Sequence, residues 1–147
     1  MRTHGYQSYY EDELLDASPL KLVLMLYRGA LDAIASARRH LRQGDIRARS
    51  RAISKSMAIV TKLSLSLDAR IGGDLSSNLA ALYGYVIRLL MQANFEQREK
   101  PLEEAEQLLS TLLEGWTDCL AEEIASRRAE REQCIARDAP EPVSCAY

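Results

Sequence analysis

Apolar residues recur at alternating spacings of three and four along four stretches of the chain, a pattern typical of helices that share one core. The clearest is the first stretch, whose stripe comprises Leu20, Val23, Tyr27, Ala30, Ile34, Ala37 and Leu41. The second runs from Ile46 to Leu67, the third from Leu75 to Ala93, and the fourth from Leu102 to Cys119. The pattern therefore predicts four helices, and strand-like alternation bounded by turns is missing from the sequence.

Local signals give the boundaries of these helices. Ser18-Pro19 is a helix start, because the hydroxyl caps free backbone N–H groups and proline suits the first helical position. Gly44-Asp45 ends the first helix and caps the second, and the pair 72–73, both glycine, is expected to end the second. Asp74 caps the third helix and Pro101 opens the fourth. Short turns between long helices predict an all-α, antiparallel four-helix bundle over residues 18–125.

Two segments flank the predicted bundle. Residues 1–17 carry Tyr6, Tyr9 and Leu14 and are expected to form an extended arm that packs on the bundle. Residues 126–147 form a charged extension in which the apolar pattern stops. The sequence leaves open whether this extension continues the fourth helix before it becomes mobile at its end.

The run LVLMLY from Leu22 to Tyr27 is apolar on every face of the first helix. A helical turn of this kind needs cover on all sides, so one flanking core does not satisfy it. Tyr27 and the other apolar residues of its stripe are predicted to face the core of the bundle. Leu22, Met25 and Leu26 are then in excess, and this excess predicts a surface that another segment or a partner covers.

Composition and charge narrow the class of protein. The chain of 147 residues is 47% hydrophobic and 27% charged, with a formal net charge of −2, which is typical of a globular domain and does not favour nucleic-acid binding. The sequence lacks a secretory signal and an apolar stretch long enough to span a membrane, and its three cysteines are far apart, so we expect a cytoplasmic protein without membrane insertion. Residues 28–70 carry a basic excess and residues 96–123 an acidic one. The two faces either complement each other or steer different partners.

Candidate chemistry is sparse, and we expect neither an enzyme nor a cofactor or metal site. His4 and His40 are expected at the surface, and the Glu-x-x-His pairs of a di-iron bundle are missing from the sequence. Cys119 and Trp116 fall on the fourth stripe and are expected in the core. Phosphate-binding and nucleophile motifs are likewise missing, so a binding module is the remaining class.

Several motifs, in order along the chain, resemble the flagellin export chaperone family, FliS. The resemblance covers residues 6–124 and rests on Tyr6-x-x-Tyr9 with Leu14, Ala17-Ser18-Pro19, Leu22, Met25-Leu26-Tyr27-x-Gly29-Ala30, Asn78-Leu79-x-x-Leu82-Tyr83-x-Tyr85, Arg88-Leu89, Ala93-Asn94 and Trp116. The sequence departs from the family pattern at Leu20-Lys21, where an acidic residue is common, and at Gly84, where a polar residue is common.

The resemblance implies a cytoplasmic chaperone that binds the disordered C-terminal segment of flagellin, prevents its premature polymerisation and delivers it to the flagellar type III export gate. It suggests flagellin-binding residues in the first and third helices: Leu22, Met25, Leu26, Tyr27, Leu82, Tyr83, Tyr85 and Leu89. Tyr6, Tyr9 and Leu14 would act as an N-terminal lid over the surface near Leu22, or else pack there permanently.

The sequence alone leaves several points open. A structural or adaptor bundle without a secretion client is the alternative function. The free protein is either a monomer or a homodimer, and other flagellar regulators are possible partners. Tyr83 and Tyr85 lie on different faces of one helix, so one is expected in the core and the other at the surface.

Overall fold

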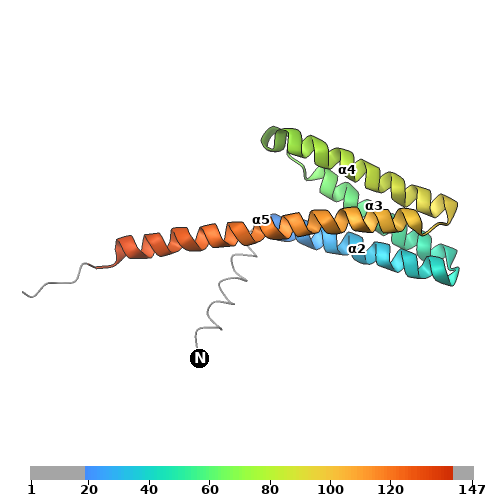
Figure 1. Cartoon of the computed structure of the whole chain (residues 1–147), viewed down its shortest axis with the longest axis horizontal. Coiled ribbons are helices and arrows are strands. Elements are labelled where there is room, and N and C mark those ends of the chain that lie inside the picture. The colour runs from blue at the N-terminus through green and yellow to red at the C-terminus, as the bar shows by residue number, and fades with distance from the viewer. Residues whose placement is uncertain (1–18, 141–147) are drawn as a thin grey trace, which may run out of the picture.

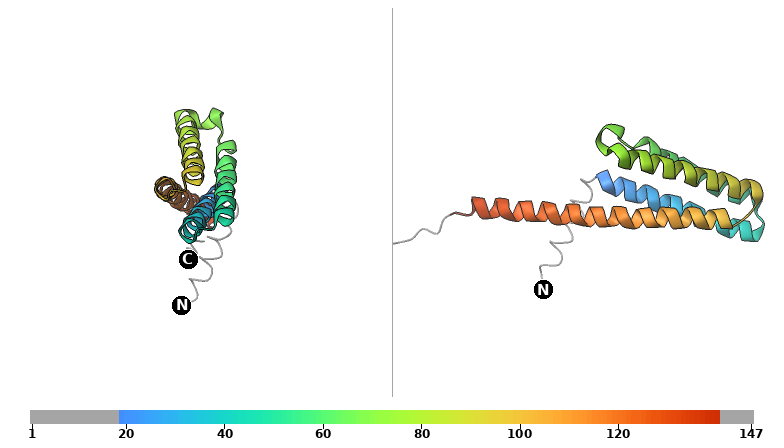
Figure 2. Two further views of the ribbon diagram at one scale, coloured as in Figure 1. Left: turned by 90° about the vertical axis from the view of Figure 1, so that its right-hand side faces the viewer. Right: turned by 45° about the horizontal axis from the view of Figure 1, so that its top comes forward.

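Four helices form the computed structural model, which describes residues 19–140 apart from the side chains of residues 69–71. They are α2 (Pro19–Gln43), α3 (Ile46–Leu65), α4 (Ala69–Glu96) and α5 (Lys100–Asp138). Successive helices run in opposite directions (Figure 1). Helix α2 packs against α3 and α5, and α4 packs against the same two, so α2 and α4 lie diagonally across the bundle (Figure 2). The predicted all-α bundle is confirmed.

Local chemistry explains where three of the helices begin. Pro19 opens α2, and Pro101 lies in the first turn of α5. Between α2 and α3, Gly44 turns the chain with a φ of 74°, in the left-handed region that glycine enters without a steric penalty. The Asp45 carboxylate then accepts a hydrogen bond of 3.0 Å from the Ala48 backbone N–H and so caps α3 as predicted.

The predicted end of the second helix is wrong. Helix α3 ends at Leu65, where the Ser66 backbone N–H still donates to the Lys62 carbonyl at 3.1 Å. The chain becomes helical again at Ala69, and Gly73 interrupts α4 with a φ of 47° and a ψ of −125°. The glycine pair therefore produces a kink within α4 and does not end α3.

Three residues assigned to the core stripes are exposed. Ile46 is 56% exposed because it is the first residue of α3, and Leu75 is 62% exposed close to the kink in α4. Cys119 is exposed, whereas Leu120 is buried. Trp116 packs against the core and Leu120, four residues further on, lies on the same face of α5, whereas Cys119 lies off that face.

Helix α5 extends well past the bundle (Figure 1). It spans 39 residues, so the charged extension continues the fourth helix as far as Asp138. Leu120 is its last buried side chain in the part of the chain that the structure describes, and an Arg127–Glu123 pair of 2.6 Å supports the next turns.

One ion cluster joins the basic and acidic halves of the chain. Arg38 on α2 pairs with Glu99 at 2.9 Å, with Glu103 at 3.1 Å and with Glu106, and Arg42 also pairs with Glu99. Hydrogen bonds from Arg42 and Arg38 lower the pKa of Glu99 below its usual value. This cluster fixes the beginning of α5 against the end of α2. Of the described residues in the basic half, only Arg38 and Arg42 take part in this cluster.

Candidate functional site

The apolar excess predicted on the first helix is exposed in the structure. Leu22 is 61% exposed and Met25 57% exposed, while Leu24 and Tyr27 on the same turns are buried in the core. Leu26 is half-buried and packs against the core from the edge of this surface. An exposed leucine alone is ordinary, but two large apolar side chains on neighbouring turns, beside Leu26, form a patch that a partner can cover.

Three aromatic side chains meet at the centre of the bundle. The hydroxyl groups of Tyr27 on α2 and Tyr83 on α4 share a hydrogen bond of 2.5 Å, with ring centroids 6.2 Å apart. The indole Nε1 of Trp116 on α5 donates to the Tyr27 hydroxyl at 3.0 Å. Burial raises the pKa of both tyrosines, so both stay protonated. The network holds three helices together across the diagonal and satisfies two buried hydroxyls.

Burial changes the interpretation of three predicted site residues. Tyr27 and Tyr83 are 0% and 1% exposed, and Leu89 is 4% exposed. In this conformation all three are core residues, and their role as flagellin contacts stays a prediction. These residues are buried because the apolar stripe that faces the core includes positions that also belong to the family motifs.

The other two α4 residues are Leu82 and Tyr85, of which Tyr85 lies at the seam with α5. Leu82 is half-buried, and Tyr85 is 37% exposed with its hydroxyl donating to the Glu104 carboxylate. That hydrogen bond raises the pKa of Tyr85, and the Arg88 guanidinium lies 5.8 Å from its ring centroid. Of the two tyrosines that the sequence could not distinguish, Tyr85 is the exposed one.

The predicted site residues therefore do not form one patch. Leu22 and Met25 lie on the outer face of α2, whereas Tyr85 lies on α4 beside α5, and α2 and α4 are diagonal neighbours. Tyr27 and Tyr83 connect the two helices through the core. A single rigid helix cannot cover both outer faces, but an extended segment that wraps the bundle can.

An apolar groove of about 260 Å³ opens at one end of the bundle, between the start of α2, the end of α3, the start of α4 and the middle of α5. Its lining includes Leu20, Val23, Leu63, Leu67, Leu75, Leu79, Tyr83 and Trp116. The sequence pattern does not predict this groove, because it lies where α3 ends early and α4 kinks. It exposes Leu75, and the tyrosine and tryptophan of the aromatic network lie in its wall.

Further exposed apolar side chains lie on the outer face of α4 and at the end of α3. Phe95 is 89% exposed, Met91 is 56% exposed and Leu65 is 81% exposed. This face of α4 is therefore open to solvent, although the opposite face is buried in the core. Met91 and Phe95 are four residues apart and both lie off the stripe of Val86, Leu89 and Ala93, a signal that could have identified them.

The described residues contain no group of three or more His, Cys, Asp or Glu side chains that could hold a metal ion. None of the helices in the part that the structure describes is both long and apolar enough to cross a membrane. The suggested lid residues Tyr6, Tyr9 and Leu14 lie outside the described residues.

A helical bundle with apolar patches on two faces and a groove at one end defines the class of the protein, a small helical protein-binding module. The chain belongs to the family described as Flagellar protein FliS, whose family model matches residues 2–123. The family predicted from the sequence motifs is confirmed.

Relatives from several bacteria align with most of the length of this chain. It is 42% identical to the "Flagellar secretion chaperone FliS" of Salmonella typhimurium over 107 residues, which cover 72% of this chain and 79% of the relative. It is 32% identical to the protein of that name in Escherichia coli, over 79% of this chain and 89% of the relative. The Campylobacter jejuni protein of the same name is 34% identical, over 78% of this chain and 89% of the relative.

Proposed function

We propose that the protein is a cytoplasmic flagellar secretion chaperone that binds the disordered C-terminal segment of flagellin, prevents its premature polymerisation and delivers it to the flagellar type III export apparatus. The observation that carries this proposal is the exposure of Leu22 and Met25 on a helix whose opposite face is already buried. Membership of the family and the printed names of the relatives support it. Under this proposal the protein has no catalytic activity and requires no cofactor.

The distribution of apolar surface suggests how a client is held. A disordered segment loses conformational entropy when it folds on a partner, so its affinity depends on a large wrapped surface. The α2 patch, the apolar groove and the Tyr85 seam lie at different places around the bundle and offer separate anchors for such a segment. Amphipathic client helices would dock with apolar side chains spaced three and four residues apart.

Co-purification with flagellin tests the proposal directly. We expect the full-length chain to form a stable 1:1 complex with a C-terminal fragment of flagellin, measured by size-exclusion chromatography with light scattering. We also expect added protein to suppress flagellin polymerisation in a turbidity assay. Absence of both the complex and the suppression would contradict the proposal and favour the adaptor alternative. The same light-scattering measurement on the free protein distinguishes a monomer from a homodimer.

The N-terminal arm is proposed to act as a lid over the α2 patch. If Tyr6, Tyr9 and Leu14 compete with the client for Leu22 and Met25, deletion of residues 1–16 should accelerate flagellin association and raise affinity several-fold. The reason is that the client no longer has to displace the arm. Stopped-flow fluorescence with a labelled flagellin C-terminal peptide measures this. A chain in which only Tyr6 and Tyr9 are replaced by serine is the control for the effect of shortening. Unchanged association rate and affinity in both variants would show that the arm is a permanent structural element.

A further inference from the structure

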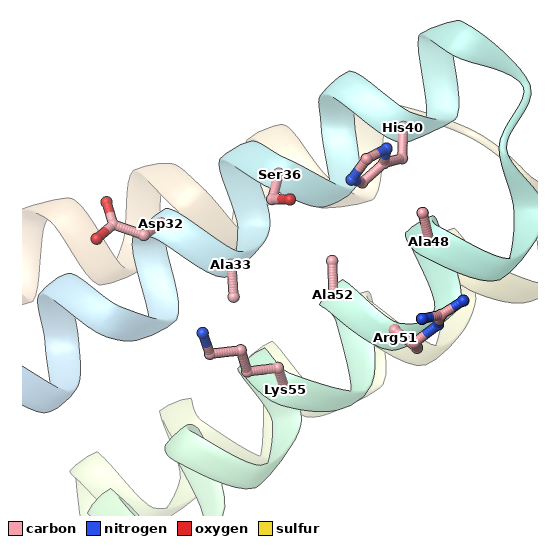
Figure 3. Close-up of a pocket in the computed structure, with 8 residues that line it drawn as sticks. All are labelled: Asp32, Ala33, Ser36, His40, Ala48, Arg51, Ala52 and Lys55. Atoms are coloured by element: carbon pink, nitrogen blue, oxygen red, sulfur yellow. The ribbon is translucent and has the colours of Figure 1, made fainter.

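A second groove lies between α2 and α3, on a part of the basic face that the ion cluster does not use (Figure 3). It has a volume of about 380 Å³ and is lined by Asp32, Ala33, Ser36, His40, Ala48, Arg51, Ala52 and Lys55. The apolar lining is alanine only, so the side chains on the floor of the groove are small. A floor of small residues lets the backbone of a docked helix approach closely, as small residues do between packed helices.

The charges around this groove differ from those of the ion cluster. Arg38 is surrounded by three glutamates, whereas Arg51 and Lys55 are exposed and form no ion pair among the described residues. Arg47, Arg51 and Lys55 follow one another at intervals of four, so they lie along one ridge of α3. Asp32 is the acidic residue of the lining. The groove therefore has a basic edge on its α3 side.

A polar atom in the groove wall lacks a partner. The His40 Nδ1 is enclosed and has no hydrogen-bond partner among the described residues. Figure 3 shows the imidazole of His40 projecting from α2 into the space between the two helices, with Ser36 one turn away. An unpaired polar atom costs free energy in a buried position, and a docked group that pairs with it after a small movement of the ring recovers that cost.

From the basic edge, the alanine floor and the unpaired imidazole, we infer that the α2–α3 groove is a docking site for an acidic amphipathic helix of a partner protein. The small apolar face of that helix would rest on Ala33, Ala48 and Ala52, and its carboxylates would meet Arg51 and Lys55. This site is separate from the apolar groove and does not depend on the proposed binding of flagellin.

The lining favours a helix over a nucleic acid. Single strands bind where bases stack on exposed aromatic rings, and Tyr, Phe and Trp are all missing from the lining of this groove. An acidic helix needs only the charges and the small floor that the groove supplies.

A model peptide tests this inference on the full-length chain. The probe is a fluorescein-labelled helix of alanine and leucine with glutamate at every fourth position, and the reference probe carries glutamine at those positions. Affinity is measured by fluorescence anisotropy. We expect the glutamate helix to bind at least about tenfold more tightly than the glutamine helix at low ionic strength. The difference should disappear at about 1 M salt, where the screening length is only about 3 Å.

Matched variants locate the binding. The double substitution Arg51→Glu and Lys55→Glu should weaken binding of the glutamate helix about tenfold or more. Arg98→Glu with Lys100→Glu, at exposed positions just before and at the start of α5, changes the formal charge equally and should leave affinity within about twofold. Ala48→Trp, which fills the floor without altering charge, should also weaken binding. Circular dichroism checks that each variant keeps its helices.

Three results would overturn the inference. Equal affinity for the two peptides would exclude recognition by charge. Equal losses of affinity for the glutamate helix in the two charge-reversed variants would show that the attraction comes from the overall charge of the protein and not from this groove. Tighter binding of a single-stranded RNA oligomer than of the glutamate helix, lost in Arg51→Glu with Lys55→Glu, would assign the groove to nucleic acid. The assay contains no flagellin, so its failure leaves the proposed chaperone function standing, and the co-purification test fails or succeeds separately.

Discussion

Replacing Leu22 and Met25 together with aspartate is expected to weaken binding of the flagellin C-terminal segment by at least about 100-fold, because buried apolar anchors dominate interface energies and a desolvated carboxylate opposes docking. The stability of the bundle should change little. Both side chains are more than half exposed, so replacing them removes little of the buried core. Isothermal titration calorimetry and urea unfolding measure the two effects.

A control variant distinguishes the effect of losing the apolar patch on flagellin affinity from the effect of adding two negative charges. Ala35→Asp with Ala58→Asp introduces the same charge at exposed positions of α2 and α3 away from Leu22 and should leave flagellin affinity within about threefold. Unchanged affinity in the Leu22→Asp, Met25→Asp variant would show that the α2 patch is not a client contact. A loss of stability as large as the loss of affinity would show that the patch is structural.

Tyr83→Ala is expected to destabilise the protein by about 3–5 kcal/mol, the usual cost of deleting a buried aromatic ring. Tyr83 is 1% exposed and its ring packs at the centre of the bundle, so the substitution leaves a cavity and removes the hydrogen-bond partner of Tyr27. Because a domain of this kind has about 5–15 kcal/mol of stability in total, the loss is a large share of it. Urea unfolding followed by circular dichroism measures the change.

Tyr83→Phe distinguishes a core role from direct contact with flagellin. The ring remains and only the hydroxyl is lost, so we expect a cost of about 1 kcal/mol, since Tyr27 keeps its hydrogen bond from Trp116. Flagellin affinity should equal that of the unmodified chain. If Tyr83→Phe bound flagellin much more weakly at full stability, the phenol would be a client contact that becomes exposed on binding, and its assignment to the core would be wrong.

The site was less predictable than the fold. The exposure of Leu22 and Met25 could be predicted from the sequence. The apolar stripe of α2 that includes Tyr27 already faces the core, so Leu22 and Met25 lie on another face of the same helix. The apolar groove did not follow, since it depends on the end of α3 at Leu65 and on the kink at Gly73. A pair of glycines marks a break, but the same signal suits a helix end and a bend within a helix.

The family, the number and order of the helices, and most of the helix starts could be predicted from the amino-acid sequence alone. These features are local: Pro19, Asp45 and Pro101 act on the backbone groups next to them, and the apolar period reports which residues share a face. The rotation of each helix about its own axis, by contrast, depends on how the four helices pack together. That rotation buries Tyr83 and exposes Tyr85, and it places the α2 and α4 surfaces on opposite sides. It also surrounds Arg38 with glutamates while leaving Arg51 free of ion pairs among the described residues. The physical reason is that the spacing of residues along one helix leaves its rotation undefined until side chains from the other helices pack against it.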